Sequence, residues 1–556
     1  MTDLLEPDNS TPSSALLFRD QRVLLVDDQR SFQVMMKAML LNLGFNKVTI
    51  LGSAEETRRR CQKELFDIYL IDYNLGLGEN GRQLLEALRE QQKLPPEAVV
   101  FIISGDNSRS MVLSALESEP DGYMMKPFSQ EQLRQRLQRA LQRKQELKEL
   151  FVALNDHDYA AVIRHCQQAL DAGTKFSTFC RCLMAEMHMR LEDPAAARAV
   201  LRSGLAAGES SWLRLGLGKA CYQLGQYDDA VAHLHTALRL RPLMVEAYRW
   251  LSSALLASNN PQEAIETLSR ATEISPHSGM LHRQLAEMAL AQGDYLRARD
   301  SMATMLELHR FDPGKTLQLL GGYVHSLILY ALNSGDPYHI GNLQKQVNNA
   351  LSRCRQLLLD SGVDFAAFEQ VCQARVQVAR GEMVRGKKML YKAIQPYQNE
   401  PDNIAVPLLS NMVLGLTQLG EYEYAEQLQP LMQGKENIDH LLLACIETGE
   451  DKGQQERHQR YLELNEQGIR AYTAGRFDEA LDCFREALRR APANTNAAIN
   501  KAQALLQLTK SRGKQTHELL EECKTTLALL DGVQLNPAQL ERLRKLQEDM
   551  QSHKSH

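Results

Sequence analysis

Five side chains suited to phosphoryl chemistry lie between residues 27 and 126: Asp27, Asp28, Asp72, Ser104 and Lys126. Three carboxylates placed together repel one another unless a hard cation compensates them, and Mg²⁺ prefers oxygen ligands. A hydroxyl and an ammonium beside that cation suit a tetrahedral anion, and a carboxylate can attack phosphorus as a nucleophile. These residue types predict an Mg²⁺ site and an aspartyl phosphate on Asp72.

The elements that must position these residues are five apolar runs of strand length. The runs are VLLV (23–26), VTIL (48–51), IYLI (68–71), VVFII (99–103) and YMM (123–125). Because amphipathic stretches separate them, they predict an α/β doubly wound five-stranded parallel sheet whose strands are buried on both faces. Such sheets bind ligands at the carboxyl edge of their strands. Each candidate residue is the first or second residue after a run, so the sheet would gather them all at that edge.

The motifs around these positions resemble those of response-regulator receiver domains, the CheY-like family. They read VDD at 26–28, IDYN at 71–74, IISGD at 102–106 and YMMKPF at 123–128. The resemblance implies that Asp72 is the phosphoacceptor and that Lys126 pairs with the phosphoryl group. It also implies that Asp28, Asp72 and the backbone carbonyl of Asn74 hold Mg²⁺, which Asp27 reaches through water. A lone aspartate after a strand is often only a helix cap, but five agreeing positions favour the phosphoryl site.

The same resemblance implies regulatory roles for further residues. Ser104 is expected to move toward phosphorylated Asp72, and Tyr123 to follow it inward. Asn74 and Asp106 resemble the positions that flank the attacking water, so we hypothesise that they tune dephosphorylation.

The loop after Asp72 departs from the family's pattern. The family usually has proline four residues beyond the acceptor and glycine eight beyond it, whereas here Gly76 and Gly81 lie four and nine beyond it. One extra residue and more glycine predict a longer, looser loop. We therefore expect the kinase-contacting surface and the phosphoryl lifetime to differ from the family's usual ones.

The remainder of the chain repeats at a tetratricopeptide interval. Val162, Ala196, Ala230, Ala264 and Ala298 are 34 residues apart at every step. This period predicts helix–turn–helix units that bury their apolar faces only against their neighbours. We therefore expect an all-α tetratricopeptide-type solenoid after the receiver domain.

The expected layout has six parts. They are a disordered tail (1–20), the receiver domain (21–130), one long linking helix (131–150), tetratricopeptide repeats (151–310), degenerate helical repeats (311–450), and a C-terminal tetratricopeptide repeat with capping helices (451–556). The linking helix could transmit the switch mechanically or serve as a solvated spacer, and the sequence leaves both alternatives open.

Composition narrows the classes of function. With 64 basic and 69 acidic residues, the chain lacks the basic excess that nucleic-acid binding usually needs. No apolar run approaches the roughly 20 residues of a membrane span, and the ten cysteines form no C-x-x-C motif. We expect a cytoplasmic protein without membrane insertion or a nucleic-acid partner. It would be a signalling adaptor, with no catalysis beyond its own Mg²⁺-dependent phosphoryl transfer and dephosphorylation.

Helical arrays of this kind usually bind a protein or peptide on a concave surface. The slot five residues into each unit carries Arg181, Leu215, Arg249 and Arg283. An arginine row would suit an acidic partner, while solvated or internally paired arginines are the alternative. We hypothesise a response regulator that is phosphorylated by a histidine kinase or a histidine phosphotransfer protein and gates partner binding by its array. The alternative is a constitutive scaffold whose receiver is mainly a docking domain.

Overall fold

The computed structural model describes most of the chain in two compact units. The described residues are 18–76, 79–105, 120–309, 312–359, 362–432, 435, 452–512, 517–533, 535 and 537–554. The units comprise residues 1–285 and 286–556 and are taken separately below. The expected tail lies almost wholly outside the described residues.

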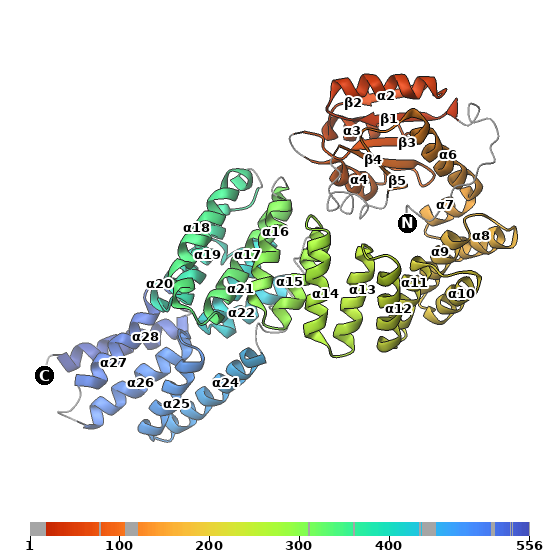
Figure 1. Cartoon of the computed structure of the whole chain (residues 1–556). Coiled ribbons are helices and arrows are strands. Elements are labelled where there is room, and N and C mark those ends of the chain that lie inside the picture. Colours follow the sequence, from red (N-terminus) through yellow and green to blue (C-terminus); the bar gives the residue numbers. More distant parts are fainter. Residues whose placement is uncertain are drawn as a thin grey trace. The chain divides into compact units, whose positions relative to one another are not determined.

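A five-stranded parallel sheet forms the centre of the N-terminal domain (Figure 1). Its strands are β1 (Arg22–Val26), β2 (Lys47–Leu51), β3 (Ile68–Asp72), β4 (Val99–Ser104) and β5 (Gly122–Met125), in the order β2-β1-β3-β4-β5. All four neighbouring pairs are parallel. Every residue of β3 and β4 is buried, as expected for strands covered on both faces. The doubly wound fold predicted from the sequence is confirmed.

Helices cover both faces of this sheet. Helices α2 (Arg30–Asn42) and α6 (Gln130–Glu146) pack on one face, where alternate strand residues such as Leu25 and Phe101 point. Helices α3 (Ala54–Cys61) and α4 (Gly81–Glu90) pack on the other, against Leu24 and Ile102. The period of two along each strand therefore divides the apolar side chains between two cores.

The stretch expected to be one long linking helix is divided at Leu147. Helix α6 ends at Glu146, and α7 (Lys148–Asn155) begins after Leu147, whose φ of −107° and ψ of 26° are not helical. The leucine face of α6 packs into the core of the α/β domain through Leu133, Leu137 and Leu141. Leu147 itself is buried among residues of the first repeats. The prediction of one long linking helix was wrong: the backbone leaves helical geometry at Leu147, whose side chain packs among the first repeats while the leucines of α6 pack on the sheet.

The helices that follow in the first unit form antiparallel pairs. They are α8 (Tyr159–Asp171), α9 (Ser177–Arg190), α10 (Pro194–Ala207), α11 (Ser211–Gln223), α12 (Tyr227–Leu240), α13 (Val245–Ala257), α14 (Pro261–Ile274) and α15 (Gly279–Ala291). The last of them, α15, continues past Leu285, where this unit ends. A residue with positive φ separates the helices of successive pairs: His157, Glu192, Gly225, Asn259 and Gly293, at intervals of 33 to 35 residues. The repeating turn confirms the tetratricopeptide-type solenoid.

One position of the 34-residue alignment is off by a residue. Ala230 and Ala264 are fully buried, as the small-residue slot requires, but Ala196 is only partly buried. Ala197 is fully buried in its place. The left-handed residue Glu192 lies 33 residues before Gly225 instead of 34, so the helix after it also starts one residue later in the repeat.

The second unit contains longer helices, which explains why the period becomes blurred there. Its helices are α16 (Tyr295–Leu308), α17 (Pro313–Asn333), α18 (Pro337–Leu359), α19 (Phe365–Ala379), α20 (Met383–Ile394), α21 (Val406–Leu419), α22 (Tyr422–Leu428), α24 (Lys452–Thr473), α25 (Phe477–Arg490), α26 (Thr495–Arg512), α27 (His517–Leu527) and α28 (Pro537–Lys554). Four short 3₁₀ turns occur at Gln395–Tyr397, Pro401–Asn403, Gln429–Met432 and Ala528–Leu530. Helices α17 and α18 have 21 and 23 residues, against 13 or 14 in α11 to α16.

A buried ionic cluster joins three helices of this unit. Lys387 of α20 is 1% exposed, and its Nζ lies 2.6 Å from Oε1 of Glu421, the residue that precedes α22. The same ammonium donates to the carbonyl of Ala493 at 2.6 Å and to Oγ1 of Thr495 at 2.9 Å, at the start of α26. Glu421 Oε1 also accepts from the Thr495 hydroxyl. The buried ammonium and the buried carboxylate thus each have polar partners, and these contacts connect α20 with the starts of α22 and α26.

Among the helices that the structure describes, none is long and apolar enough to cross a bilayer.

Candidate functional site

Three carboxylates meet at the carboxyl edge of the sheet. Asp27 and Asp28 follow β1, and Asp72 ends β3, which pairs with β1 in parallel. One oxygen from each of the three lies within 4.8 Å of the other two. Asp27 and Asp72 are buried, whereas Asp28 is exposed. The Asp27 side chain is held in place because its Oδ1 accepts a hydrogen bond from the backbone N–H of Gln29 at 2.8 Å.

Lys126, which follows β5, reaches the two buried carboxylates. Its Nζ lies 2.7 Å from Asp27 Oδ2 and 3.2 Å from Asp72 Oδ2. The ammonium also lies 3.7 Å from the centroid of the Phe32 ring on α2. A cation between an aromatic face and two carboxylates is well placed, because both attract it. Phe32 was missed in the sequence, where it is simply one apolar residue of an amphipathic helix.

The charge state of Asp72 reflects its crowded surroundings. Burial raises the pKa of Asp72 to about 6; Lys126 opposes this rise, and Asp27 and Asp28 add to it. Among the described residues, its buried Oδ1 has no hydrogen-bond partner. An unpartnered buried carboxylate oxygen is costly, and a divalent cation or a bound phosphoryl group would compensate it. The three carboxylates therefore fit a hard cation such as Mg²⁺.

The other predicted site residues lie around this edge. Ser104 ends β4 and is buried, and its carbonyl accepts from the backbone N–H of Lys126 at 2.7 Å. Tyr123 lies in β5, partly buried, and its carbonyl accepts from Arg136 Nη1 at 2.9 Å. Asn74 is exposed two residues after Asp72. Asp106 lies outside the described residues. The switching and dephosphorylation roles of these residues stay predictions.

The glycines after Asp72 permit close backbone approach. A Cβ on Gly81, the first residue of α4, would lie 2.1 Å from the carbonyl oxygen of Asp72. Gly76 has a φ of 80°, and a Cβ there would lie 3.1 Å from Asp28 Oδ2. Asn80 then starts α4 by accepting from the backbone N–H of Gln83, in a reciprocal capping box. Gly76 and Gly81 are thus required by the site's geometry, which the sequence alone did not reveal.

Comparison with known families matches both parts of the chain. The model for the response regulator receiver domain matches residues 23–138, and a tetratricopeptide repeat model matches residues 215–279 and 465–510. The N-terminal domain is a response-regulator receiver domain. It therefore belongs to the family of two-component signalling domains, and tetratricopeptide repeats follow it in the same chain.

Three curated relatives illustrate how far the similarity extends. Chemotaxis protein CheY-3 of Vibrio cholerae is 27% identical over 129 residues, which are 23% of this chain and 98% of that protein. Chemotaxis protein CheY of Pseudomonas aeruginosa is 25% identical over 122 residues, covering 22% and 97%. Sensor protein GacS of Pseudomonas syringae pv. syringae is 32% identical over 123 residues, covering 21% and 13%. Each of these matches covers less than a quarter of the present chain.

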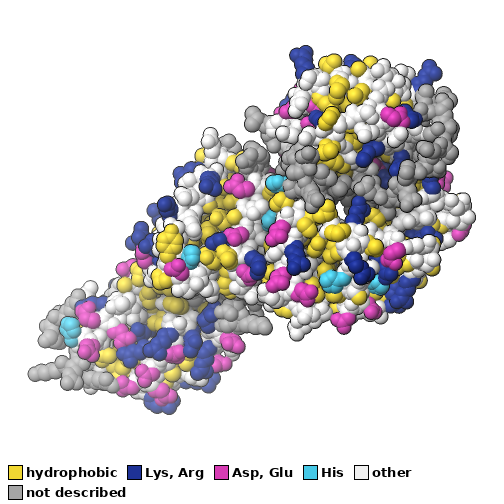
Figure 2. Space-filling model, viewed as in Figure 1, with side chains coloured by type: hydrophobic (Ala, Val, Ile, Leu, Met, Phe, Trp, Pro, Cys, Tyr) yellow, Lys and Arg dark blue, Asp and Glu magenta, His cyan; other side chains and the backbone are white. Residues whose placement is uncertain are grey.

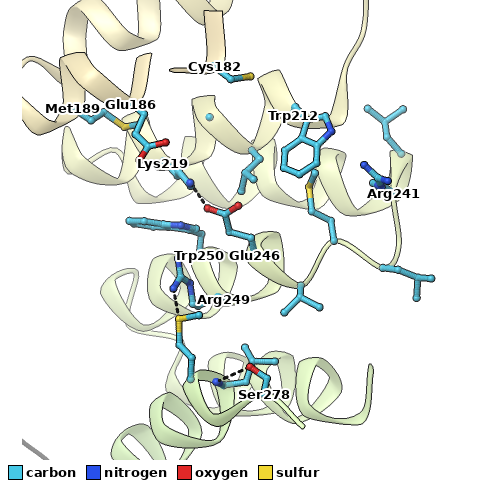
Figure 3. Close-up of a pocket in the computed structure, with 18 of the residues that line it drawn as sticks. Cys182, Glu186, Met189, Trp212, Lys219, Arg241, Glu246, Arg249, Trp250 and Ser278 are labelled. Atoms are coloured by element: carbon cyan, nitrogen blue, oxygen red, sulfur yellow. Dashed lines mark hydrogen bonds and ion pairs between the residues drawn. The ribbon is translucent and has the colours of Figure 1, made fainter. Parts of the chain in front are cut away.

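A groove of about 790 Å³ lies within the repeats of the first unit (Figure 3). Residues of α9, α11 and α13 and the start of α15 line it. Trp212 and Trp250, the only tryptophans of the chain, are both among them. These two tryptophans were not singled out from the sequence, although tryptophan is rare in this chain and is often found in binding sites.

The predicted arginine row contributes only one member to this groove. Arg249 lines it, whereas Arg181 and Arg283 are not among its lining residues. Arg181 packs instead beside Gly204 of α10, where an added Cβ would lie 2.8 Å from its Cδ. Leu215, in the same slot, is buried at the groove wall. An arginine row as the partner site stays a prediction, and Arg249 is the member best placed to serve it.

Proposed function

We propose that this protein is a response regulator in which phosphorylation of Asp72 gates protein binding by the repeat array. The phosphoryl donor would be a histidine kinase or a histidine phosphotransfer protein. The observation that carries the proposal is the buried Oδ1 of Asp72, which lies beside Asp27, Asp28 and Lys126 and has no hydrogen-bond partner among the described residues. A carboxylate oxygen in this position is a nucleophile for phosphorus with a cation already at its side.

Each residue of the acidic site would have a distinct role in phosphoryl transfer. Asp72 attacks phosphorus, the new O–P bond replaces the P–N bond of the phosphohistidine, and the donor's histidine leaves. Lys126 turns from the Asp72 carboxylate to the phosphoryl oxygens, retaining its contact with Asp27. Mg²⁺, which Asp27, Asp28, Asp72 and the Asn74 carbonyl would hold, supplies charge compensation for the transferred group. Ser104 then moves toward the phosphoryl group and Tyr123 follows it.

Helix α6 offers a physical route from this site to the array. Arg136, in the first half of α6, donates to the carbonyl of Tyr123 in β5. Further along, Arg143 pairs with Asp121 beside β5, and its guanidinium lies 5.2 Å from the Phe179 ring of α9. A phosphoryl group shifts an equilibrium only through contacts that differ between two states. Through these contacts α6 touches both β5, which carries Tyr123, and the first repeats. A change at β5 on phosphorylation would therefore reach the repeats through α6.

The exposed face of α2 suits docking of the phosphodonor. Val34, Met35 and Leu41 are 67%, 42% and 49% exposed, and Ala38 between them is also exposed. We name these four residues the α2 stripe; hydrophobic side chains are visible over α2 in Figure 2. The helix starts at Arg30, two residues after Asp28, so the stripe lies on the helix that directly follows the acidic cluster. Apolar residues at this spacing fit the helical surface of a partner protein.

Val34→Asp is expected to slow phosphoryl transfer from the donor protein at least about tenfold, because a charge would be buried in the interface. Transfer from acetyl phosphate, which needs no docking surface, should be unchanged. The measurement is the rate of phosphoprotein formation with each donor. Leu65→Asp is the matched control, since Leu65 is 41% exposed elsewhere on the domain. An unchanged rate with the donor protein would show that the α2 stripe does not dock it.

A further inference from the structure

The groove of the repeat array combines aromatic and exposed aliphatic side chains. Trp212 and Trp250 line it together with Leu240, Leu243 and Met280, which are 47%, 38% and 48% exposed. A volume of about 790 Å³ falls in the range of roughly 300–1,000 Å³ that holds compact ligands. The groove therefore has room for a few side chains of a short segment and not for a folded domain.

Guanidinium groups lie over both tryptophans. Arg241 is 5.5 Å from the ring centroid of Trp212, and Arg249 is 5.9 Å from that of Trp250. Arg249 Nη1 donates to the sulfur of Met280 at 2.6 Å, and a thioether is only a weak acceptor. Lys219 forms an ion pair with Glu246 inside the groove (Figure 3). Arg249 thus offers charge-assisted hydrogen bonds to a carboxylate that arrives next to apolar side chains.

A segment with the complementary chemistry stands near the start of the same chain. Residues 3–8 read DLLEPD, in which two adjacent leucines are flanked by three acids. No Lys, Arg or His occurs among residues 1–18. Nine residues separate Asp8 from Phe18, the first described residue, and such a tether extends to about 30 Å at most.

We propose that residues 3–8 occupy this groove as an intramolecular ligand. Leu4 and Leu5 would pack on the tryptophans while a neighbouring carboxylate meets Arg249. A tether of only nine residues gives an effective concentration near the millimolar range, so even a weakly binding segment competes with outside partners. The inference goes beyond the proposed function, since it names an occupant of the groove that needs no phosphorylation.

Intrinsic fluorescence provides the test, because both tryptophans of the chain line the groove. The probe is an acetylated synthetic peptide of residues 2–9, titrated into the full chain without Mg²⁺ or a phosphodonor. Three proteins are compared: the wild type, the variant Leu4→Ser with Leu5→Ser, and the matched control Leu16→Ser with Leu17→Ser. For a peptide Kd of about 0.1 mM, we expect roughly tenfold tighter binding to the first variant than to the other two proteins.

Adding Arg249→Glu to the Leu4→Ser, Leu5→Ser variant should abolish the emission change. Equal peptide affinity for all three proteins would overturn the proposal, as would an absence of binding to any of them. An emission change in the wild type that grows with protein concentration would assign the groove to a second copy, which also overturns intramolecular docking. None of these outcomes depends on phosphorylation, so a failure of intramolecular docking can be distinguished from a failure of the proposed function.

Discussion

Asp72→Asn is expected to lower the rate of phosphoryl uptake at least about 10³-fold, because an amide oxygen is a poor nucleophile and carries no charge for the cation. Because asparagine has nearly the same size and shape as aspartate, it fits the buried position beside Asp27 and Lys126, and the fold should survive. The measurement is the intact mass of the protein after incubation with Mg²⁺ and acetyl phosphate.

Asp20→Asn is the control for that experiment, since Asp20 is an exposed carboxylate of the same domain. It should be phosphorylated like the wild type. Phosphorylation of Asp72→Asn at the wild-type rate would place the acceptor elsewhere, and peptide mapping would show whether it is Asp27 or Asp28.

Lys387→Met is expected to reduce the free energy of unfolding of the second unit by about 3–5 kcal/mol, because Glu421 would remain buried without its cation. Burial lowers the pKa of Lys387 while Glu421 opposes this, so the ammonium depends on its carboxylate partner. With a urea m-value of about 1–3 kcal/mol/M, the midpoint should fall by at least about 1 M.

The two units can be followed separately in that measurement. Both tryptophans lie in the first unit, so their fluorescence reports on it, whereas circular dichroism reports on the helices of both. Lys387→Met should move the dichroism transition of the second unit and leave the fluorescence transition in place. Lys388→Met, at the exposed neighbouring position, is the matched control and should change neither. An unchanged midpoint in Lys387→Met would show that the ionic cluster contributes little.

The receiver site was predictable because its chemistry follows from strand ends. Continuous apolar runs of strand length such as IYLI, separated by amphipathic stretches, are typical of strands buried on both faces. A parallel sheet brings Asp27, Asp72 and Lys126 to one edge. The predicted roles of Ser104 and Tyr123 are movements between the unphosphorylated and the phosphorylated state, so they depend on the difference between two conformations of the domain.

Features that depend on tertiary contacts were not predictable. The leucines of α6 form one face of the predicted linking helix, but their burial against the sheet and the end of the helix at Glu146 depend on tertiary contacts. The small-residue slot falls on Ala197 because the preceding turn is one residue displaced, which a fixed period cannot show. Likewise, Trp212 and Trp250 are 38 residues apart in the sequence and meet in the groove only when the repeats stack.

The central claim is that phosphorylation gates protein binding by the array, and capture of partners in the presence of beryllofluoride tests it most directly. The full chain is immobilised with Mg²⁺, with or without beryllofluoride as a mimic of aspartyl phosphate, and the captured lysate proteins are identified by mass spectrometry. Asp72→Ala and Arg249→Glu serve as controls for the acceptor and the groove. The proposal predicts that beryllofluoride changes which proteins the wild type captures. In Asp72→Ala, capture should be the same with and without beryllofluoride. In Arg249→Glu, these proteins should not be captured at all. An identical set of proteins under all conditions would contradict gating and indicate a constitutive scaffold.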